Sequence, residues 1–163
     1  MSRLVTKKRG AAGALVLAAT LAGTLAVQKV GGDEGLRLKT YKDIVGVSTY
    51  CYGETQGAKT GQTYTKAQCD ALLLKRLDEF ANHVESCVKA PMSDKTEVAF
   101  TSLAYNIGWA GFCKSTTVRL YNAGDKAGAC HAMRKFNRAG GRVIPGLDGR
   151  RKREEALCLE GLK

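Results

Sequence analysis

The feature that most restricts how this chain can fold is a run of eighteen uncharged residues near its N-terminus, Gly10 to Val27. The run is just long enough for a helix that crosses the hydrocarbon core of a bilayer. Before it, the first nine residues carry four basic and no acidic side chains, and a flank of this kind stays in the cytoplasm. We therefore expect an N-terminal hydrophobic helix, followed by a body that folds on the outer side of the membrane.

The composition of this run leaves two alternatives open. Seven Ala and three Gly leave only six Leu or Val side chains to hold it in lipid, so its grip on a membrane should be weak. The run could be a signal peptide cleaved after Ala26, with Thr24 as the other small residue of the cleavage site. Glu34 follows only seven residues after Val27, however, which favours a retained signal anchor. We expect an anchor over residues 1–30 and one folded domain over residues 31–163.

All six cysteines lie in the expected exported domain, which favours disulfide bonds. No two have the Cys-x-x-Cys spacing of a zinc site, and the chain has only two histidines, so we expect no metal and no other cofactor. Six cysteines allow fifteen connectivities, and the sequence does not choose among them. We favour Cys51 with Cys69, Cys130 with Cys158 and, as the remainder, Cys87 with Cys113.

Apolar periodicity and turn residues predict an α+β fold, mainly helical with one small β-hairpin lobe. Thr65, with Gln68 three residues later, has the form of a capping box at the start of a long helix. The other predicted elements are a short helix over Asp33–Lys39, a strand over Ile44–Tyr52, a helix after Ser93, and helices over Ser115–Asn122, Asp125–Arg138 and Gly149–Glu160.

Lysines and arginines outnumber acidic residues by 26 to 15, which gives a net charge of +11 and favours an anionic partner. Nucleic acid, acidic lipid and the polymers of a bacterial envelope all meet that condition. The charge is spread along the chain and only 7% of the residues are aromatic, unlike the stacking platforms of single-strand binders. We therefore expect no nucleic acid partner.

The candidate catalytic residues are Glu34, Asp43 and Thr49, separated by eight and by five residues. Cleavage of a glycosidic bond needs one carboxyl that gives a proton to the leaving oxygen and an ionised carboxylate near the anomeric carbon. A glutamate on a packed helix suits the first task and an aspartate just before a strand suits the second, while the threonine hydroxyl can position water. By itself, a spacing of three common residue types is a weak signal.

The spacing is similar to the E-x8-D-x5-T pattern of phage T4-type lysozymes, and three further motifs follow in the order of that family. They are YNIG from Tyr105, GF at Gly111–Phe112, and GLDGRRKRE from Gly146. The resemblance runs from about residue 33 to the C-terminus, and is strongest to endolysins of lambdoid phages with release-type anchors.

This resemblance implies that Glu34 is the proton donor, that Asp43 is the base or charge stabiliser, and that Thr49 positions water. It also implies that an arginine near the start of the last motif, best matched by Arg150, approaches the catalytic glutamate. We take Arg150 and Phe112 as candidate substrate-binding residues. Trp109 is considered with Phe112 as a residue that lines a sugar site, and burial in the core is the favoured interpretation for both.

The implied protein is a muramidase endolysin that hydrolyses the β-1,4 bond between N-acetylmuramic acid and N-acetylglucosamine in peptidoglycan and so causes host lysis. Its partners would be peptidoglycan and, through the anchor, the host inner membrane. The anchor would be of the signal-arrest-release type, with a monomeric catalytic domain in the periplasm that is later freed there.

Two alternative functions stay open. A lytic transglycosylase on the same fold needs an acidic glutamate but no hydrolytic water, so the presence of Asp43 and Thr49 argues for hydrolysis. A non-catalytic, membrane-anchored basic binding protein is the second. We interpret Arg150 to Arg153 mainly as a solvated helix face with one side chain turned to the site, and we assign no special role to His83 or His131.

Overall fold

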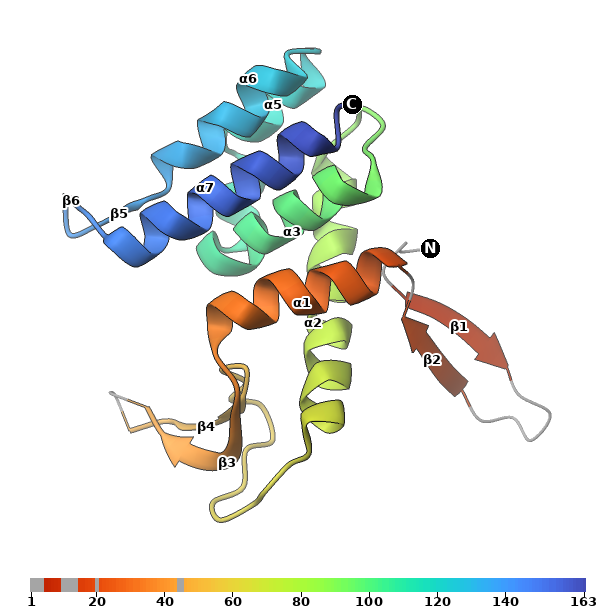
Figure 1. The fold of residues 1–163 in the computed structure, drawn as a ribbon, viewed down its shortest axis with the longest axis vertical. Helices are drawn as coiled ribbons and strands as arrows, with labels where there is room; N and C mark the ends of the chain where they lie inside the picture. The colour runs from red at the N-terminus through yellow and green to blue at the C-terminus, as the bar shows by residue number, and fades with distance from the viewer. Residues whose placement is uncertain (1–4, 10–14, 20, 44–45) are drawn as a thin grey trace.

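The computed structural model of the chain describes residues 5–9, 15–19, 21–43 and 46–163. A small β-lobe and a larger helical lobe are joined by the long helix α2, which Figure 1 shows crossing behind α1. The elements are β1 (Val5–Arg9), β2 (Leu15–Ala19), α1 (Leu21–Glu34), β3 (Arg37–Lys42), β4 (Ser48–Cys51), α2 (Lys66–Cys87), α3 (Asp94–Ile107), α4 (Trp109–Cys113), α5 (Thr116–Asn122), α6 (Lys126–Ala132), a 3-10 turn (Met133–Lys135), β5 (Arg138–Ala139), β6 (Arg142–Val143) and α7 (Pro145–Glu160).

Helix α3 is the centre of the helical lobe. Its residues from Thr96 to Ala104 are all buried, and it packs against α1, α2 and α7. A helix that is buried on every side needs partners all around it, and burial of large apolar side chains such as Phe100 and Leu103 is its main source of stability. Ser93 accepts a hydrogen bond from the amide of Thr96, which confirms the predicted cap.

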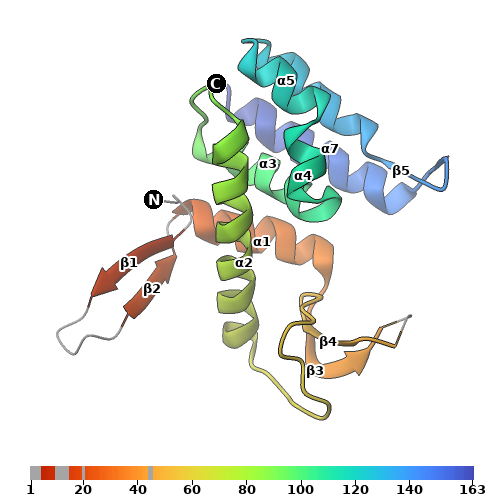
Figure 2. The same ribbon diagram turned by 180° about the vertical axis from the view of Figure 1, so that it is seen from behind.

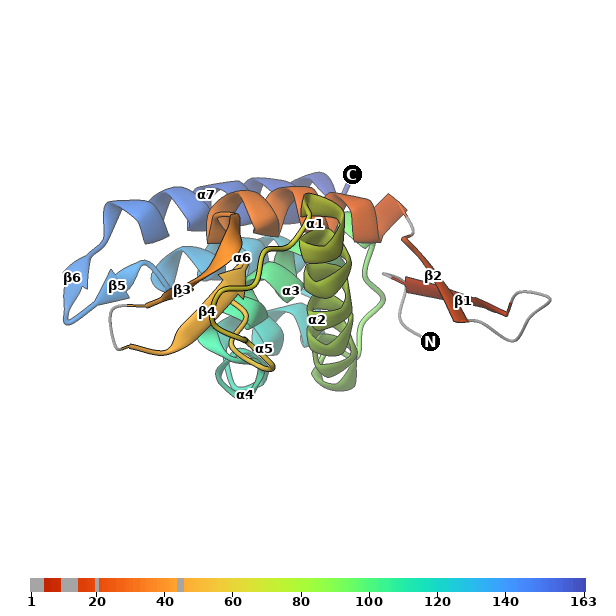
Figure 3. The same ribbon diagram turned by 90° about the horizontal axis from the view of Figure 1, so that it is seen from below.

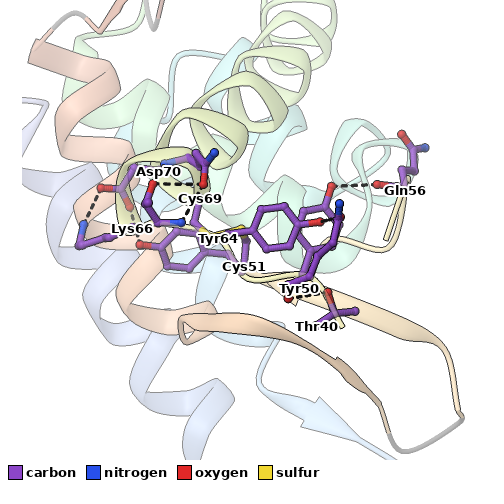
Figure 4. The surroundings of a disulfide bond; sticks show 12 residues. Thr40, Tyr50, Cys51, Gln56, Tyr64, Lys66, Cys69 and Asp70 are labelled. Atoms are coloured by element: carbon purple, nitrogen blue, oxygen red, sulfur yellow. Dashed lines mark hydrogen bonds and ion pairs between the residues drawn. A yellow bond between two sulfur atoms is a disulfide. The ribbon is translucent and has the colours of Figure 1, made fainter. Parts of the chain in front are cut away.

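The β-lobe is a hairpin of β3 and β4, in which Tyr41 pairs with Thr49. Figure 4 shows how its inner side is closed: the Tyr50 ring stacks on the Tyr64 ring at 4.5 Å, and the Tyr50 hydroxyl donates to the carbonyl of Gln56 at 2.9 Å. The capping box of Thr65 and Gln68 then starts α2, as predicted. Figures 1 and 3 show the β3–β4 hairpin and the β5–β6 hairpin on the same side of the molecule.

The favoured disulfide pairing is confirmed. Cys51–Cys69 ties β4 to the start of α2, Cys87–Cys113 ties the end of α2 to α4, and Cys130–Cys158 ties α6 to α7. Each disulfide therefore cross-links two different elements of the fold, and no described cysteine is free.

The predicted N-terminal hydrophobic helix is not found in the expected form, although residues 10–14 and 20 of the span lie outside the described residues. Strands β1 and β2 form an antiparallel hairpin in which Val5 pairs with Ala19, and α1 begins only at Leu21. Within the described ranges, no helix combines the length and the apolar character that crossing a membrane requires.

The helix predicted over Asp33–Lys39 is wrong, because α1 ends at Glu34 and the chain then enters β3. Gly35 has a φ of +75°, a left-handed conformation that ends helices at low cost only for glycine. Upstream, Ala22, Ala26 and Val30 lie four residues apart and are at most 3% exposed, so burial against α2 and α3 sets this helix. This four-residue spacing could not be recognised in the sequence, because apolar and small residues occupy every face of a helix built from the uncharged run.

Three further boundaries differ from the prediction. The strand expected over Ile44–Tyr52 is observed as β4 from Ser48, with Ile44 and Val45 outside the described residues. Helix α6 ends at Ala132, because the chain tightens there into a 3-10 turn before the short β5–β6 hairpin. Helix α7 begins at Pro145 rather than Gly149, since proline's fixed φ suits the first helical position.

Replacing Cys51 and Cys69 together by Ala should lower the free energy of unfolding by about 3 kcal/mol, since their bond closes a loop with a sequence separation of 18. Denaturant unfolding measures the loss. The pair Cys87 and Cys113, separated by 26 residues, is the matched control and should cost a similar amount. A negligible loss for the first pair beside a full loss for the second would contradict the structural role of the β4–α2 link.

Candidate active site

The C-terminal end of α1 meets α7 at Arg150. Arg150 Nη1 donates a 2.6 Å hydrogen bond to Glu34 Oε1, across 116 residues of sequence. The Arg150 side chain is only 7% exposed, and that of Glu34 is 22% exposed. Burial lowers the pKa of Arg150, but the Glu34 and Glu154 charges outweigh burial and raise it above its ordinary value, so the guanidinium stays charged. The predicted approach of Arg150 to Glu34 is therefore observed.

Glu154 lies behind Arg150 and holds it in place. Its Oε1 accepts hydrogen bonds from Arg150 Nε at 3.0 Å, from Arg151 Nη2 at 3.0 Å and from Ser102 Oγ at 2.6 Å. Its Oε2 faces Arg151 Nε at 2.8 Å as an ion pair rather than an aligned hydrogen bond. Burial raises the pKa of the Glu154 carboxyl, and the charges of Arg151 and Arg150 and the bond from Ser102 oppose that rise.

A second contact joins the same two helices. Asp33 forms an ion pair with Arg153 and lies 3.8 Å from Arg150 Nε. The interpretation of Arg150 to Arg153 as a mainly solvated face is wrong for its first half: Arg150 and Arg151 are buried, whereas Lys152 and Arg153 are exposed. The reason is the helical spacing to Glu154, which lets two arginines share one buried carboxylate.

Asp43 and Thr49 form the other half of the candidate site, on the β-lobe. Asp43 Oδ1 accepts a 2.8 Å hydrogen bond from the amide of Val47, and Thr49 Oγ1 donates a 3.1 Å bond to the Val47 carbonyl. The peptide groups of one residue thus fix both side chains. Asp43 is half-buried and Thr49 is 4% exposed. Strand β3 connects this half to Glu34.

Tyr105, near the end of α3, lies where the two lobes meet. Burial raises the pKa of its hydroxyl, and the carboxylates of Glu34 and Glu54 raise it further. Glu54 belongs to the β-lobe and forms an ion pair with Arg76 of α2 at 3.2 Å. The carboxylates that raise the pKa of the Tyr105 hydroxyl thus come from the end of α1 and from the β-lobe.

The remaining aromatic and histidine side chains differ in their burial. Phe112 is fully buried and packs against Phe100 with ring centroids 5.5 Å apart, so its side chain has no surface to offer a sugar and the core alternative holds. Trp109, by contrast, is 45% exposed. His131 pairs with Glu155 on the surface at 2.6 Å, and His83 stacks on Trp109.

Sequence reasoning missed Ser102, Glu154 and Asp33 as parts of this network. The spacing of Arg150 and Arg151 to Glu154 on one helix was a usable signal for an ion pair. Ser102 and Asp33 gave no such signal, because their partners lie on elements far away in the sequence.

Comparison with known proteins bears on the whole domain. A family model described as phage lysozyme matches residues 32–154. A SAR-endolysin of Bacteriophage PS119 is 41% identical over 90% of this chain and 93% of its own length, and a SAR-endolysin of Pseudomonas phage phiKMV is 36% identical over 93% and 91%. A crystal structure of a P22 lysozyme mutant superposes with a TM-score of 0.78 at 32% identity, covering 83% of this chain and 96% of that one.

Replacing Glu154 by Ala should lower the free energy of unfolding by about 3–5 kcal/mol, because two buried guanidinium groups lose the counter-charge that they share. The control is Glu160→Ala on the same helix, whose partner Lys95 is half exposed, and which should cost at most about 1 kcal/mol. Chemical denaturation of both variants gives the comparison. Equal small losses would show that the buried network contributes no stability.

Proposed function

The chain belongs to the phage lysozyme family and is an endolysin, a glycosidase that hydrolyses peptidoglycan in host lysis; from that premise we propose that Glu34, Asp43 and Thr49 are its catalytic residues. The observation that carries this proposal is the 2.6 Å bond by which buried Arg150 fixes the carboxyl of Glu34. A proton donor must be held in one orientation toward the bond that breaks. The Arg150 guanidinium can do this because Glu154 holds it in place and balances its charge.

Glu34 is the general acid in this proposal. Arg150 Nη1 contacts Oε1, which leaves Oε2 as the atom that carries the proton and delivers it to the glycosidic oxygen. Departure of that oxygen builds positive charge on the anomeric carbon of the muramic acid unit. The bond cleaved is the β-1,4 bond between N-acetylmuramic acid and N-acetylglucosamine.

Asp43 and Thr49 act on the other side of the sugar. The Asp43 carboxylate, whose Oδ1 accepts a hydrogen bond from the Val47 amide, stabilises the charge at the anomeric centre or takes a proton from water. Thr49 Oγ1 uses its hydrogen on the Val47 carbonyl, which leaves its oxygen free to accept a hydrogen bond from that water.

Glu34→Gln keeps the shape of the side chain but removes the transferable proton, and should lower the rate of peptidoglycan hydrolysis by about 10²–10⁴-fold. Release of new reducing ends from purified peptidoglycan measures the rate, and circular dichroism checks the fold. Glu160→Gln, at an exposed position of α7, is the control and should keep full activity. Retention of wild-type activity by Glu34→Gln would rule out this acid, and 1,6-anhydro ends in place of reducing ends would indicate transglycosylation.

We further propose that residues 1–30 are a signal-arrest-release anchor, which first holds the catalytic domain (residues 31–163) at the inner membrane on the periplasmic side. Ala22 and Ala26 support this proposal, because they belong both to the uncharged run and to the buried face of α1. They cannot lie in lipid and in the protein core together. Anchoring therefore withholds the helix that carries Glu34, and release into the periplasm as a monomer lets it pack.

Gly13→Leu should delay lysis, because each leucine in the span favours the membrane by about 0.5 kcal/mol. Gly13→Asp is the opposite change and should advance it. Lysis time and the share of enzyme in the membrane fraction are measured for both variants, with the activity of the purified released proteins as the control. Unchanged timing and distribution for both would contradict a reversible anchor.

A further inference from the structure

Four aromatic side chains form a continuous row of ring contacts that the proposed chemistry does not use; we call it the aromatic ledge and define it as Phe80, His83, Tyr105 and Trp109. The first three are partly exposed and Trp109 is exposed. The Tyr105 ring lies 5.1 Å from Phe80, Phe80 lies 6.5 Å from His83, and His83 stacks on Trp109 at 4.3 Å with 8° between the planes. Phe80 and His83 belong to α2, Tyr105 belongs to α3 and Trp109 belongs to α4. Helices α3 and α4 both pack against α2, and Figure 2 shows the three helices together.

The outer end of the ledge is open. Trp109 is 45% exposed although it is the chain's only tryptophan, whereas Phe112, three residues later, is completely buried. Since His83 covers one face of the indole, the exposed area has to come from the opposite face and the ring edges. A tryptophan that served only to pack α4 would be expected at the buried position.

The stack is also fixed in place. His83 and Trp109 each lie four residues before a cysteine of the Cys87–Cys113 disulfide, so the bond that joins α2 to α4 holds their rings together. A flat apolar surface that is ordered before a ligand arrives loses little entropy on binding.

The inner end of the ledge lies near the candidate catalytic residues. Tyr105 is one helical turn beyond Ser102, whose carbonyl accepts a 3.2 Å hydrogen bond from the same Arg150 that holds Glu34. Tyr105 also lines a small cavity with Glu54 and Arg76, where α2 meets the β-lobe. The ledge thus runs from the neighbourhood of the Arg150 network outward to Trp109.

We propose that the aromatic ledge extends the substrate site and that Trp109 binds the apolar face of a peptidoglycan sugar beyond the two sugars at the cleaved bond. The inference rests on the proposed function, since it needs a glycan strand bound at Glu34. Sugar rings present C–H groups on their faces and hydroxyls at their edges, and exposed indole offers both apolar area and an N–H donor. A polymer that occupies Glu34 and Trp109 together is held more tightly than a short fragment.

The single tryptophan makes the proposal directly observable. Glu34→Gln protein, which binds without cutting, is titrated with peptidoglycan glycan strands of increasing length, stripped of stem peptides. Isothermal titration calorimetry records binding while tryptophan emission and its quenching by acrylamide report on Trp109. We expect a saturable emission shift and reduced quenching for long strands, and neither for the shortest strand that binds. Cellulose oligomers of equal length are the control ligand.

Substitutions give the energetic test. Trp109→Ala should weaken binding of long strands about three- to tenfold, with a matching rise in KM and a smaller change in kcat, as expected for the loss of one stacked ring. Trp109→Phe should restore most of the affinity. His83→Phe keeps the stack and should bind as wild type, whereas His83→Ala should bind more weakly.

Several outcomes would overturn the proposal. Calorimetric binding of long strands without any change in tryptophan emission would do so, as would equal affinity of Trp109→Ala and wild type. An emission change that requires stem peptides would reassign the ledge from sugar to peptide. Failure of the proposed function is separately visible, because Glu34→Gln protein would then still release reducing ends.

Discussion

The Arg150 guanidinium joins the proposed proton donor to the protein core. Its Nη1 donates to Glu34, its Nε donates to Glu154, and its Nη2 donates to the carbonyl of Ser102. A buried charge of this kind persists only if opposite charges and hydrogen bonds surround it. Three arginines of α7 meet three carboxylates here, so the network is close to neutral even though the chain carries +11. Glu34 is thereby placed by a helix that lies more than a hundred residues later.

The same contact explains how an export segment and an active site can depend on each other. Helix α1 buries Ala26 and Val30 against the core and ends at Glu34, where Asp33 and Glu34 reach the arginines of α7. In the folded enzyme the apolar face of α1 packs against α2 and α3. In the proposed anchored state α1 does not occupy that site. Release from the membrane would then activate the enzyme, and no separate regulatory site would be needed.

The sequence and the family resemblance predicted several contacts around the candidate site better than they predicted the local structure there. The favoured cysteine pairing is observed, although the sequence left fifteen connectivities open. The capping box at Thr65 followed from spacing, the approach of Arg150 to Glu34 followed from family resemblance, and both are observed. The helix that carries Glu34 was misplaced, because an all-apolar run has no periodicity from which its buried face could be read. The burial of Arg151 was also unexpected, since its partner Glu154 becomes a shared counter-charge only after α7 packs on α3.

The most direct test is a crystal structure of Glu34→Gln protein with a peptidoglycan fragment that spans the cleaved bond. The account predicts that the amide at position 34 lies about 2.6–3.2 Å from the glycosidic oxygen, still held by Arg150, with Asp43 on the opposite face of the muramic acid ring. A fragment bound away from position 34, or carboxyl groups that approach the sugar from one face, would contradict it.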